Sequence, residues 1–319
     1  MALLTSEYRP PKFLRGSHVE TIFPALTRRF RIKYNRSRIP TKDGDFLDLD
    51  WSRVGSRRLV IVTHGLEACS KDQYILGMVR AMNRAHFDCV AWNLRGCSGE
   101  PNLKIFTYHS GATYDLDEVV MHAIGLGAYR EIYLIGFSLG GNLTLKFLGE
   151  PWKSVKSIKS AVAFSVPCDL EGCSIRLSQH DSQIYLKRFL RAFRRKVKMK
   201  AKQFPGLVNV DGLSKIKNFA EFDERFTAPM FGFKSAQDYW KKSSSLGFLK
   251  NIKTPSLLVS AKNDPFLSAS CFPEKEVKRH KYLHGEFPEH GGHCGFSMFD
   301  SDGLNYAEKR AVRFITEGF

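Results

Sequence analysis

Ser138 lies in a sequence pattern that is typical of a catalytic nucleophile. The segment reads Gly-Phe-Ser-Leu-Gly from Gly136 to Gly140, after an apolar run that predicts a strand and before a segment that predicts a helix. A serine on so sharp a turn needs a strained backbone and small neighbours two residues away, which the two glycines provide. The helix N-terminus also offers backbone N–H groups that can stabilise a developing oxyanion. We therefore predict nucleophilic attack by Ser138; the alternative is a glycine-rich turn with a structural serine.

A serine nucleophile requires a base, and the base requires an acid that orients it. After a strand–turn–helix nucleophile of this kind, the acid and then the histidine follow along the chain. Asp264 comes directly after the predicted strand 256–261, and His293 lies in a glycine-rich loop before the last predicted helix. We predict Asp264 as the acid, although Asn-Asp-Pro is also a common turn sequence. We predict His293 as the base, with His290 and His284 as alternatives.

A second segment is predicted to help bind the oxyanion. His64-Gly65-Leu66 follows the predicted strand 59–63, where an oxyanion loop is expected. The backbone N–H groups of Leu66 and Leu139 are therefore predicted to form the oxyanion hole. His64 itself is an alternative base, but its position between a strand and a glycine favours a scaffolding role.

This chemistry requires neither a cofactor nor a metal. His290, His293 and Cys294 are of metal-ligand type, but no second ligand cluster accompanies them in the sequence. The seven cysteines are scattered and odd in number, at positions 69, 89, 97, 168, 173, 271 and 294. A reduced, cytoplasmic protein is therefore expected rather than a disulfide framework.

Strands and helices are predicted to alternate along most of the chain. Strand signals occur at 59–63, 89–93, 131–135, 161–166, 256–261 and 281–283, and helical spacing occurs at 72–85, 113–126, 139–148 and 305–315. Thr113 is a plausible N-cap for the second of these helices. Such alternation predicts an α/β fold with a mostly parallel sheet covered by helices on both faces.

Two regions of the chain depart from this alternation. The first thirty residues are predicted to form an irregular arm with a short helix near 19–22, followed by a hairpin of 31–39 with 46–51. Between residues 169 and 254 the strand signal disappears, and helical stretches occur at 183–202, 213–225 and 236–242. We predict one domain, 1–319, with 169–254 inserted as a helical cap over the carboxyl edge of the sheet, where ligands of α/β proteins bind.

Composition and charge narrow the class of protein. Hydrophobic residues make up 43% of the chain and aromatic residues 13%, which excludes a disordered protein. No apolar run approaches the roughly 18 residues of a membrane-spanning helix, and the first residues do not resemble a secretory signal. The formal net charge is 49 − 32 = +17, which attracts anionic partners without identifying one. No nucleic-acid recognition motif is present, so specific nucleic-acid binding is not predicted.

The stretch 183–202 combines an apolar face with many basic residues. A basic amphipathic helix of this kind can contact an anionic membrane or attract acidic lipid substrates. The simpler interpretation is a cap helix whose basic face is solvated. Phenylalanines in the rest of the predicted cap indicate an apolar acyl pocket or the cap's own core.

Several motifs together resemble the YheT-like branch of the α/β-hydrolases, nearly end to end. They are Gly16-Ser-His-Val-Glu-Thr-Ile22, His64-Gly-Leu-Glu67, Asn93-Leu-Arg-Gly-Cys-Ser-Gly-Glu-Pro-Asn102, Tyr108-His-Ser-Gly111, Gly136-Phe-Ser-Leu-Gly-Gly-Asn142, Glu221-Phe-Asp-Glu-Arg-Phe-Thr-Ala-Pro229 and Gly291-Gly-His-Cys-Gly-Phe296. The chain departs from the usual family pattern where the oxyanion loop continues with Ala68 and Cys69.

The resemblance implies the α/β-hydrolase fold and a serine esterase or lipase-like activity on carboxylic esters. The catalytic triad carries over as Ser138, Asp264 and His293, and the expected partner is a small-molecule acyl ester. A thioesterase or amidase would use the same residues, and a catalytically silent binding module of the same fold is a further alternative.

Overall fold

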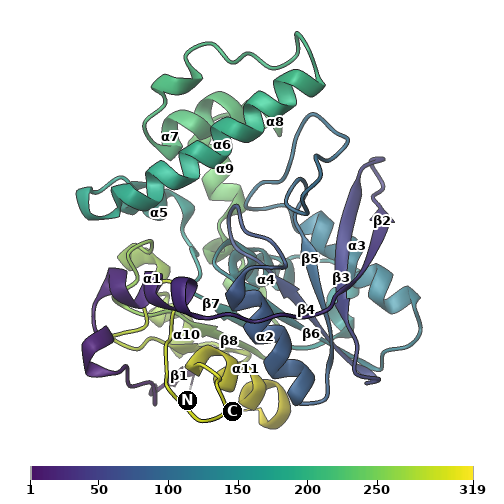
Figure 1. Ribbon diagram of the computed structural model, residues 1–319, viewed down its shortest axis with the longest axis vertical. Coiled ribbons are helices and arrows are strands. Elements are labelled where there is room, and N and C mark those ends of the chain that lie inside the picture. The colour runs from purple at the N-terminus through teal and green to yellow at the C-terminus, as the bar shows by residue number, and fades with distance from the viewer. Residues whose placement is uncertain (1, 319) are drawn as a thin grey trace.

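The structure, a computed structural model, describes residues 2–318 and is built on a nine-stranded sheet (Figure 1). Residues 1 and 319, the ends of the predicted domain, lie outside the described residues. The strand order is β1-β9-β8-β7-β6-β4-β5-β3-β2. The strands are β1 (Leu3–Leu4), β2 (Asn35–Pro40), β3 (Phe46–Ser52), β4 (Arg58–Thr63), β5 (Asp88–Asn93), β6 (Glu131–Phe137), β7 (Ile158–Phe164), β8 (Ser256–Val259) and β9 (Leu283–Glu286). Within residues 2–318, only the β2–β3 and β3–β5 pairs are antiparallel, which confirms the predicted α/β class with its mostly parallel sheet.

Helices connect these strands and cover the sheet. They are α1 (Ser17–Thr27), α2 (Gln73–Arg84), α3 (Thr113–Gly125), α4 (Leu139–Gly149), α5 (Leu170–Leu177), α6 (Gln183–Gln203), α7 (Phe219–Phe222), α8 (Ala228–Met230), α9 (Ala236–Ser243), α10 (Glu274–Lys278) and α11 (Tyr306–Glu317). Among residues 2–318, no helix is both long and apolar enough to cross a bilayer.

Two hydrophobic cores form on the opposite faces of the sheet. Leu116 of α3 and Leu143 of α4 belong to one core, and Met78 of α2 and Ala311 of α11 belong to the other. Ile61 of β4 packs into the first core, while the residues on either side of it pack into the second. The continuous apolar run of β4 therefore reflects a strand that is buried on both faces.

The helices α5 to α9 all lie between β7 and β8 in the chain and form a layer on one side of the molecule, away from the N- and C-terminal ends (Figure 1). We call this segment the helical layer. Leu186, Leu190 and Val197 of α6 pack with Phe222 and Phe226 in a separate small core. The layer thus has its own apolar interior and does not extend either core of the sheet.

Local structure differs from the sequence expectation in the region 213–225. A single helix was expected there. The structure instead has a 3₁₀ turn at Leu213–Lys215, then α7, then a π-helical turn at Asp223–Thr227. The Asn218 side chain accepts a hydrogen bond from the Glu221 N–H and caps α7, so the helix begins anew at this point.

Two further expectations about helix ends and the arm were wrong. Thr113 is the first residue of α3 and not its N-cap, which is Ala112; its hydroxyl instead donates to Glu150. The arm is more regular than expected, because α1 runs from Ser17 to Thr27 and β1 pairs in parallel with β9. The helix predicted near 19–22 is present within α1 but is longer than expected, and β1 was not predicted because it pairs with a strand near the other end of the chain.

Candidate active site

The turn between β6 and α4 holds Ser138 in a left-handed backbone conformation. Its φ is 52° and its ψ is −121°, which is a strained geometry for a residue with a side chain. The Ser138 N–H donates to the Phe164 carbonyl of the neighbouring strand at 2.8 Å. A Cβ at Gly136 would overlap the backbone of Gly140, and a Cβ at Gly140 would overlap the Thr63 carbonyl. The two glycines are therefore required by close packing at the elbow.

The structure brings the three predicted triad side chains together. His293 Nε2 lies 2.9 Å from Ser138 Oγ, and His293 Nδ1 lies 2.8 Å from Asp264 Oδ2. Asp264 follows β8 and is 3% exposed, while His293 lies in the loop after β9. The other carboxylate oxygen of Asp264 accepts the Phe266 N–H at 2.8 Å, which fixes the orientation of the acid. This arrangement can transfer a proton from Ser138 to the imidazole.

The environment of His293 favours its charged form. Burial opposes a charge on the imidazole, but the facing Asp264 carboxylate, with Cys294 beside it, outweighs burial and raises the pKa of His293 to about 10. The carboxylate therefore stabilises the charged imidazolium form of His293.

The alternative bases do not occupy this position. His64 Nε2 accepts the Leu94 N–H at 3.1 Å, and its Nδ1 lies 2.8 Å from the Gly65 carbonyl oxygen. Burial lowers the pKa of His64 to about 4, so this histidine is a neutral scaffold between two loops. His284 lies within β9, and the Nδ1 of His290 lies 3.7 Å from the buried carboxylate of Glu20.

The predicted oxyanion-hole residues lie beside Ser138. Leu66 and Leu139 both border the cavity that contains Ser138 and His293. Leu139 is the first residue of α4, so its N–H has no acceptor within the helix. A Cβ at Gly65 would lie 3.1 Å from the Ser138 Cβ, which shows how closely the loop before Leu66 approaches the nucleophile. Donation by these two N–H groups remains a prediction.

Helix α1 supports the loop that carries His293, and this contact was not expected from the sequence. The His293 N–H donates to Thr21 Oγ1 at 2.9 Å. The Gly292 N–H donates to Asn263 Oδ1 at 3.0 Å, and Asn263 Nδ2 donates to the fully buried Glu20 carboxylate at 2.5 Å. The arm motif quoted above for its resemblance contains both α1 residues, but nothing in its local pattern indicated which loop they would contact.

A second support reaches His293 from the helical layer. The Phe266 ring stacks on the His293 imidazole, with ring centroids 3.9 Å apart and planes inclined by 15°. Phe266 in turn packs against Tyr185 and Phe189 of α6. The position of the imidazole therefore depends on packing within the layer above the sheet.

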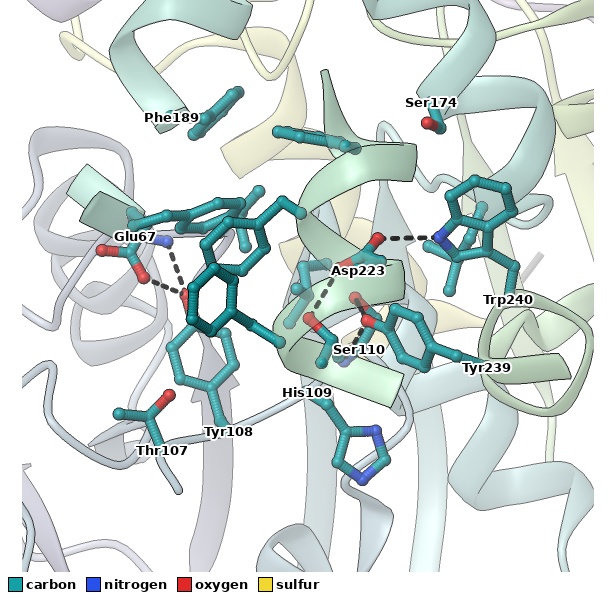
Figure 2. A pocket seen from close by; sticks show the side chains of 18 of the residues that line it. Glu67, Thr107, Tyr108, His109, Ser110, Ser174, Phe189, Asp223, Tyr239 and Trp240 are labelled. Atoms are coloured by element: carbon teal, nitrogen blue, oxygen red, sulfur yellow. Dashed lines mark hydrogen bonds between the residues drawn. The ribbon is translucent and has the colours of Figure 1, made fainter. Parts of the chain in front are cut away.

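A cavity of about 150 Å³ lies between the helical layer and the sheet, and Ser138 and His293 contribute to its wall. Most of the remaining wall is apolar or aromatic. Figure 2 shows one polar exception, Asp223, directed at Trp240, whose indole N–H donates to it at 2.8 Å. Burial raises the pKa of Asp223 to about 6. The cavity can hold an apolar group next to the serine hydroxyl.

A buried ion pair joins the helical layer to the loop of Leu66. Lys196 of α6 donates to Glu67 Oε1 at 2.7 Å, and both side chains are nearly buried, with exposed fractions of 12% and 9%. The Tyr108 hydroxyl also donates to this oxygen and accepts the Glu67 N–H (Figure 2). Burial would lower the pKa of Lys196, but Cys97 and Glu67 outweigh it and raise the pKa, so the lysine stays charged. Sequence patterns gave no indication of this pair, whose members are 129 residues apart.

Replacing Lys196 by methionine is expected to reduce both stability and turnover. The change leaves the Glu67 carboxylate buried without its cation, which costs about 3–5 kcal/mol of unfolding free energy. A displaced Leu66 N–H would lower kcat by up to about a hundredfold. Denaturant unfolding and ester kinetics measure the two effects.

Lys198→Met is the matched control, because Lys198 is an exposed neighbour on the same helix. The double change Lys196→Met with Glu67→Gln removes the unpaired charge and should recover much of the lost stability. Equal stabilities for Lys196→Met and the control would contradict a structural role for the pair.

Comparisons with known proteins agree with the fold. Residues 58–296 match the family model described as the alpha/beta hydrolase fold. YheT of Escherichia coli (strain K12), named as a candidate esterase, is 31% identical, covering 92% of this chain and 87% of that protein. Phospholipase ABHD3 of Mus musculus is 30% identical, covering 92% of this chain and 74% of that protein. The solved esterase Pf2001 of Pyrococcus furiosus shares the fold, with a TM-score of 0.58, 18% identity, and coverage of 89% and 92%.

The chain therefore belongs to the alpha/beta hydrolase fold family. Within that family it is similar over nearly its whole length to YheT, which confirms the resemblance drawn from the motifs. Carboxylic-ester hydrolysis is the class of activity that membership of this group supports.

Proposed function

We propose that this protein hydrolyses carboxylic esters through an acyl-enzyme formed on Ser138. The observation that carries the proposal is the hydrogen-bonded series Ser138–His293–Asp264 at the wall of an apolar cavity. The names of the relatives, esterase and phospholipase, support the same class of reaction. The proposed substrate is a small-molecule acyl ester whose acyl group occupies the cavity.

The reaction follows from the positions of these groups. Neutral His293 accepts the Ser138 proton at Nε2 as the oxygen attacks the ester carbonyl, while Asp264 holds the Nδ1–H. The negative charge on the carbonyl oxygen is stabilised by the N–H groups of Leu66 and Leu139, each contributing about 3–4 kcal/mol. The imidazolium then protonates the leaving alcohol. His293 then takes a proton from water as the water oxygen attacks the acyl-enzyme carbonyl. The His293 imidazolium returns this proton to the Ser138 oxygen as the acid leaves.

The cavity volume predicts a preference for short acyl chains. An apolar cavity of about 150 Å³ holds a benzene-sized group, or about six carbons. In a panel of p-nitrophenyl esters from acetate to laurate, kcat/KM is expected to peak at the butyrate or hexanoate. Equal rates across the panel, or no hydrolysis of any ester, would count against the proposal; thioesters of the same acyl groups should be included.

A change in the cavity wall should move this optimum. Phe189 lines the cavity between Phe219 and Phe266, so Phe189→Ala is expected to favour longer chains. Phe13→Ala is the matched control, because Phe13 is 73% exposed and contributes nothing to the cavity.

A further inference from the structure

Helix α6 is the long helix of the helical layer (Figure 1). Six basic residues, all exposed, form a stripe along one of its faces. The basic stripe consists of Lys187, Arg188, Arg191, Arg195, Lys198 and Lys202. At the helical rotation of about 100° per residue, these positions fall within an arc of about 100°. They extend along about 22 Å of the helix, so the six charges form one continuous surface.

The fold does not use these six charges. Among residues 2–318, none of the six forms an ion pair or a hydrogen bond, and α6 contains no acidic residue. Successive members such as Arg191 and Arg195 are like charges one turn apart, which destabilises a helix. Two other lysines of α6 do have structural roles: Lys196 pairs with Glu67, and Lys200 donates to backbone carbonyls of the loop 102–104. The basic stripe therefore destabilises α6 and gives the fold no ion pair or hydrogen bond within the described residues.

One exposed apolar side chain lies in the arc of the basic stripe, and another follows α6 along the chain. Ile184, 64% exposed, falls in the same arc one turn before Arg188. Leu207, 71% exposed, lies in the loop that follows α6. A lipid surface combines anionic phosphates with an apolar layer beneath them, whereas a nucleic-acid backbone offers only the phosphates. The combination of side chains fits a lipid surface better.

We propose that the basic stripe, together with Ile184, docks the protein on the surface of an anionic lipid bilayer. The charges attract anionic headgroups, and Ile184 enters the boundary between headgroups and acyl chains. The opposite face of α6 contributes Phe189 and Phe193 to the cavity, so the docked surface lies one helix diameter, about 10 Å, from that cavity. Docking itself requires no hydrolysis.

Vesicle flotation tests the proposal with the Ser138→Ala protein, which leaves the lipids intact. Vesicles contain either phosphatidylcholine alone or three parts phosphatidylcholine to one part phosphatidylserine. Binding is expected only to the anionic vesicles and should weaken with added salt. Changing Arg188, Arg191, Arg195 and Lys198 to glutamine should reduce binding roughly several hundredfold, since each cation contributes roughly fivefold.

The matched control changes Lys153, Lys156, Lys159 and Lys253 to glutamine. These lysines are exposed and precede or begin β7 and β8, at the opposite edge of the sheet, and the change in net charge is the same. The control should bind as the parent does. The proposal is overturned if anionic vesicles are not bound, if both variants bind equally well, or if only a DNA duplex distinguishes them. Hydrolysis of soluble esters is measured on the same two glutamine variants with Ser138 retained. It should be unchanged in both, so loss of docking can be distinguished from loss of activity.

Discussion

Replacing Ser138 by alanine is expected to lower kcat for ester hydrolysis by on the order of 10⁶-fold, the effect of removing the nucleophile from a triad. The remaining groups retain their hydrogen bonds, because His293 is still fixed by Asp264, Thr21 and Phe266. The protein should therefore stay folded, and the loss should appear in kcat. Hydrolysis of p-nitrophenyl butyrate by both proteins measures the change.

A fluorophosphonate probe provides an independent readout of the same residue. The probe should label the wild-type protein covalently and leave Ser138→Ala unlabelled. Ser178→Ala is the control, because Ser178 is exposed at the end of α5 and its hydroxyl donates to the nearby Ser174 carbonyl. Equal ester hydrolysis by wild type and Ser138→Ala would exclude an acyl-enzyme on Ser138, and no hydrolysis by either protein would favour the silent binding module.

Replacing Asp264 by asparagine is expected to lower kcat about 10⁴-fold. The amide no longer holds the Nδ1–H tautomer of His293 and no longer stabilises the imidazolium. The substitution also removes the carboxylate that raises the pKa of His293. Stopped assays at saturating ester measure the loss, and thermal unfolding shows whether the variant is folded.

The same change should move the pH dependence of kcat/KM. His293 acts as a base only when neutral, so wild-type activity rises with pH, with a midpoint above the ordinary histidine pKa of about 6.5. Without the carboxylate, burial of the imidazole dominates, and the midpoint of Asp264→Asn should lie at lower pH. A midpoint that stays in place would show that Asp264 does not set the charge of His293.

The sequence predicted those features that local patterns specify. Buried strands such as β4 and β6 are continuous apolar runs, so their positions were predicted to within two residues. Ser138 was identified because an elbow needs small residues at fixed positions around it. Asp264 and His293 followed from chain order and from loops after strands, and the structure brings both side chains to Ser138.

Contacts between distant side chains could not be predicted in this way. The Glu67–Lys196 pair and the contact of Thr21 with His293 each join residues more than a hundred positions apart. Neither has a periodic or motif-like signal, because their geometry exists only after the sheet and the helical layer have formed. The break in the helix predicted for 213–225 has a local cause instead, because the Asn218 side chain accepts a hydrogen bond from the Glu221 N–H and caps a new helix there.

The contact between α1 and the histidine loop has a practical consequence for anyone trimming this protein. The region matched by the family model begins at residue 58, yet Thr21 holds the His293 backbone and a Cβ at Gly292 or Gly295 would run into the backbone around Glu20. A shortened version that starts at residue 58 would lack α1, and the loop of His293 would lose these contacts and face solvent. A version of the protein that keeps the His293 loop in place must therefore begin before α1, well ahead of residue 58 where the family match starts.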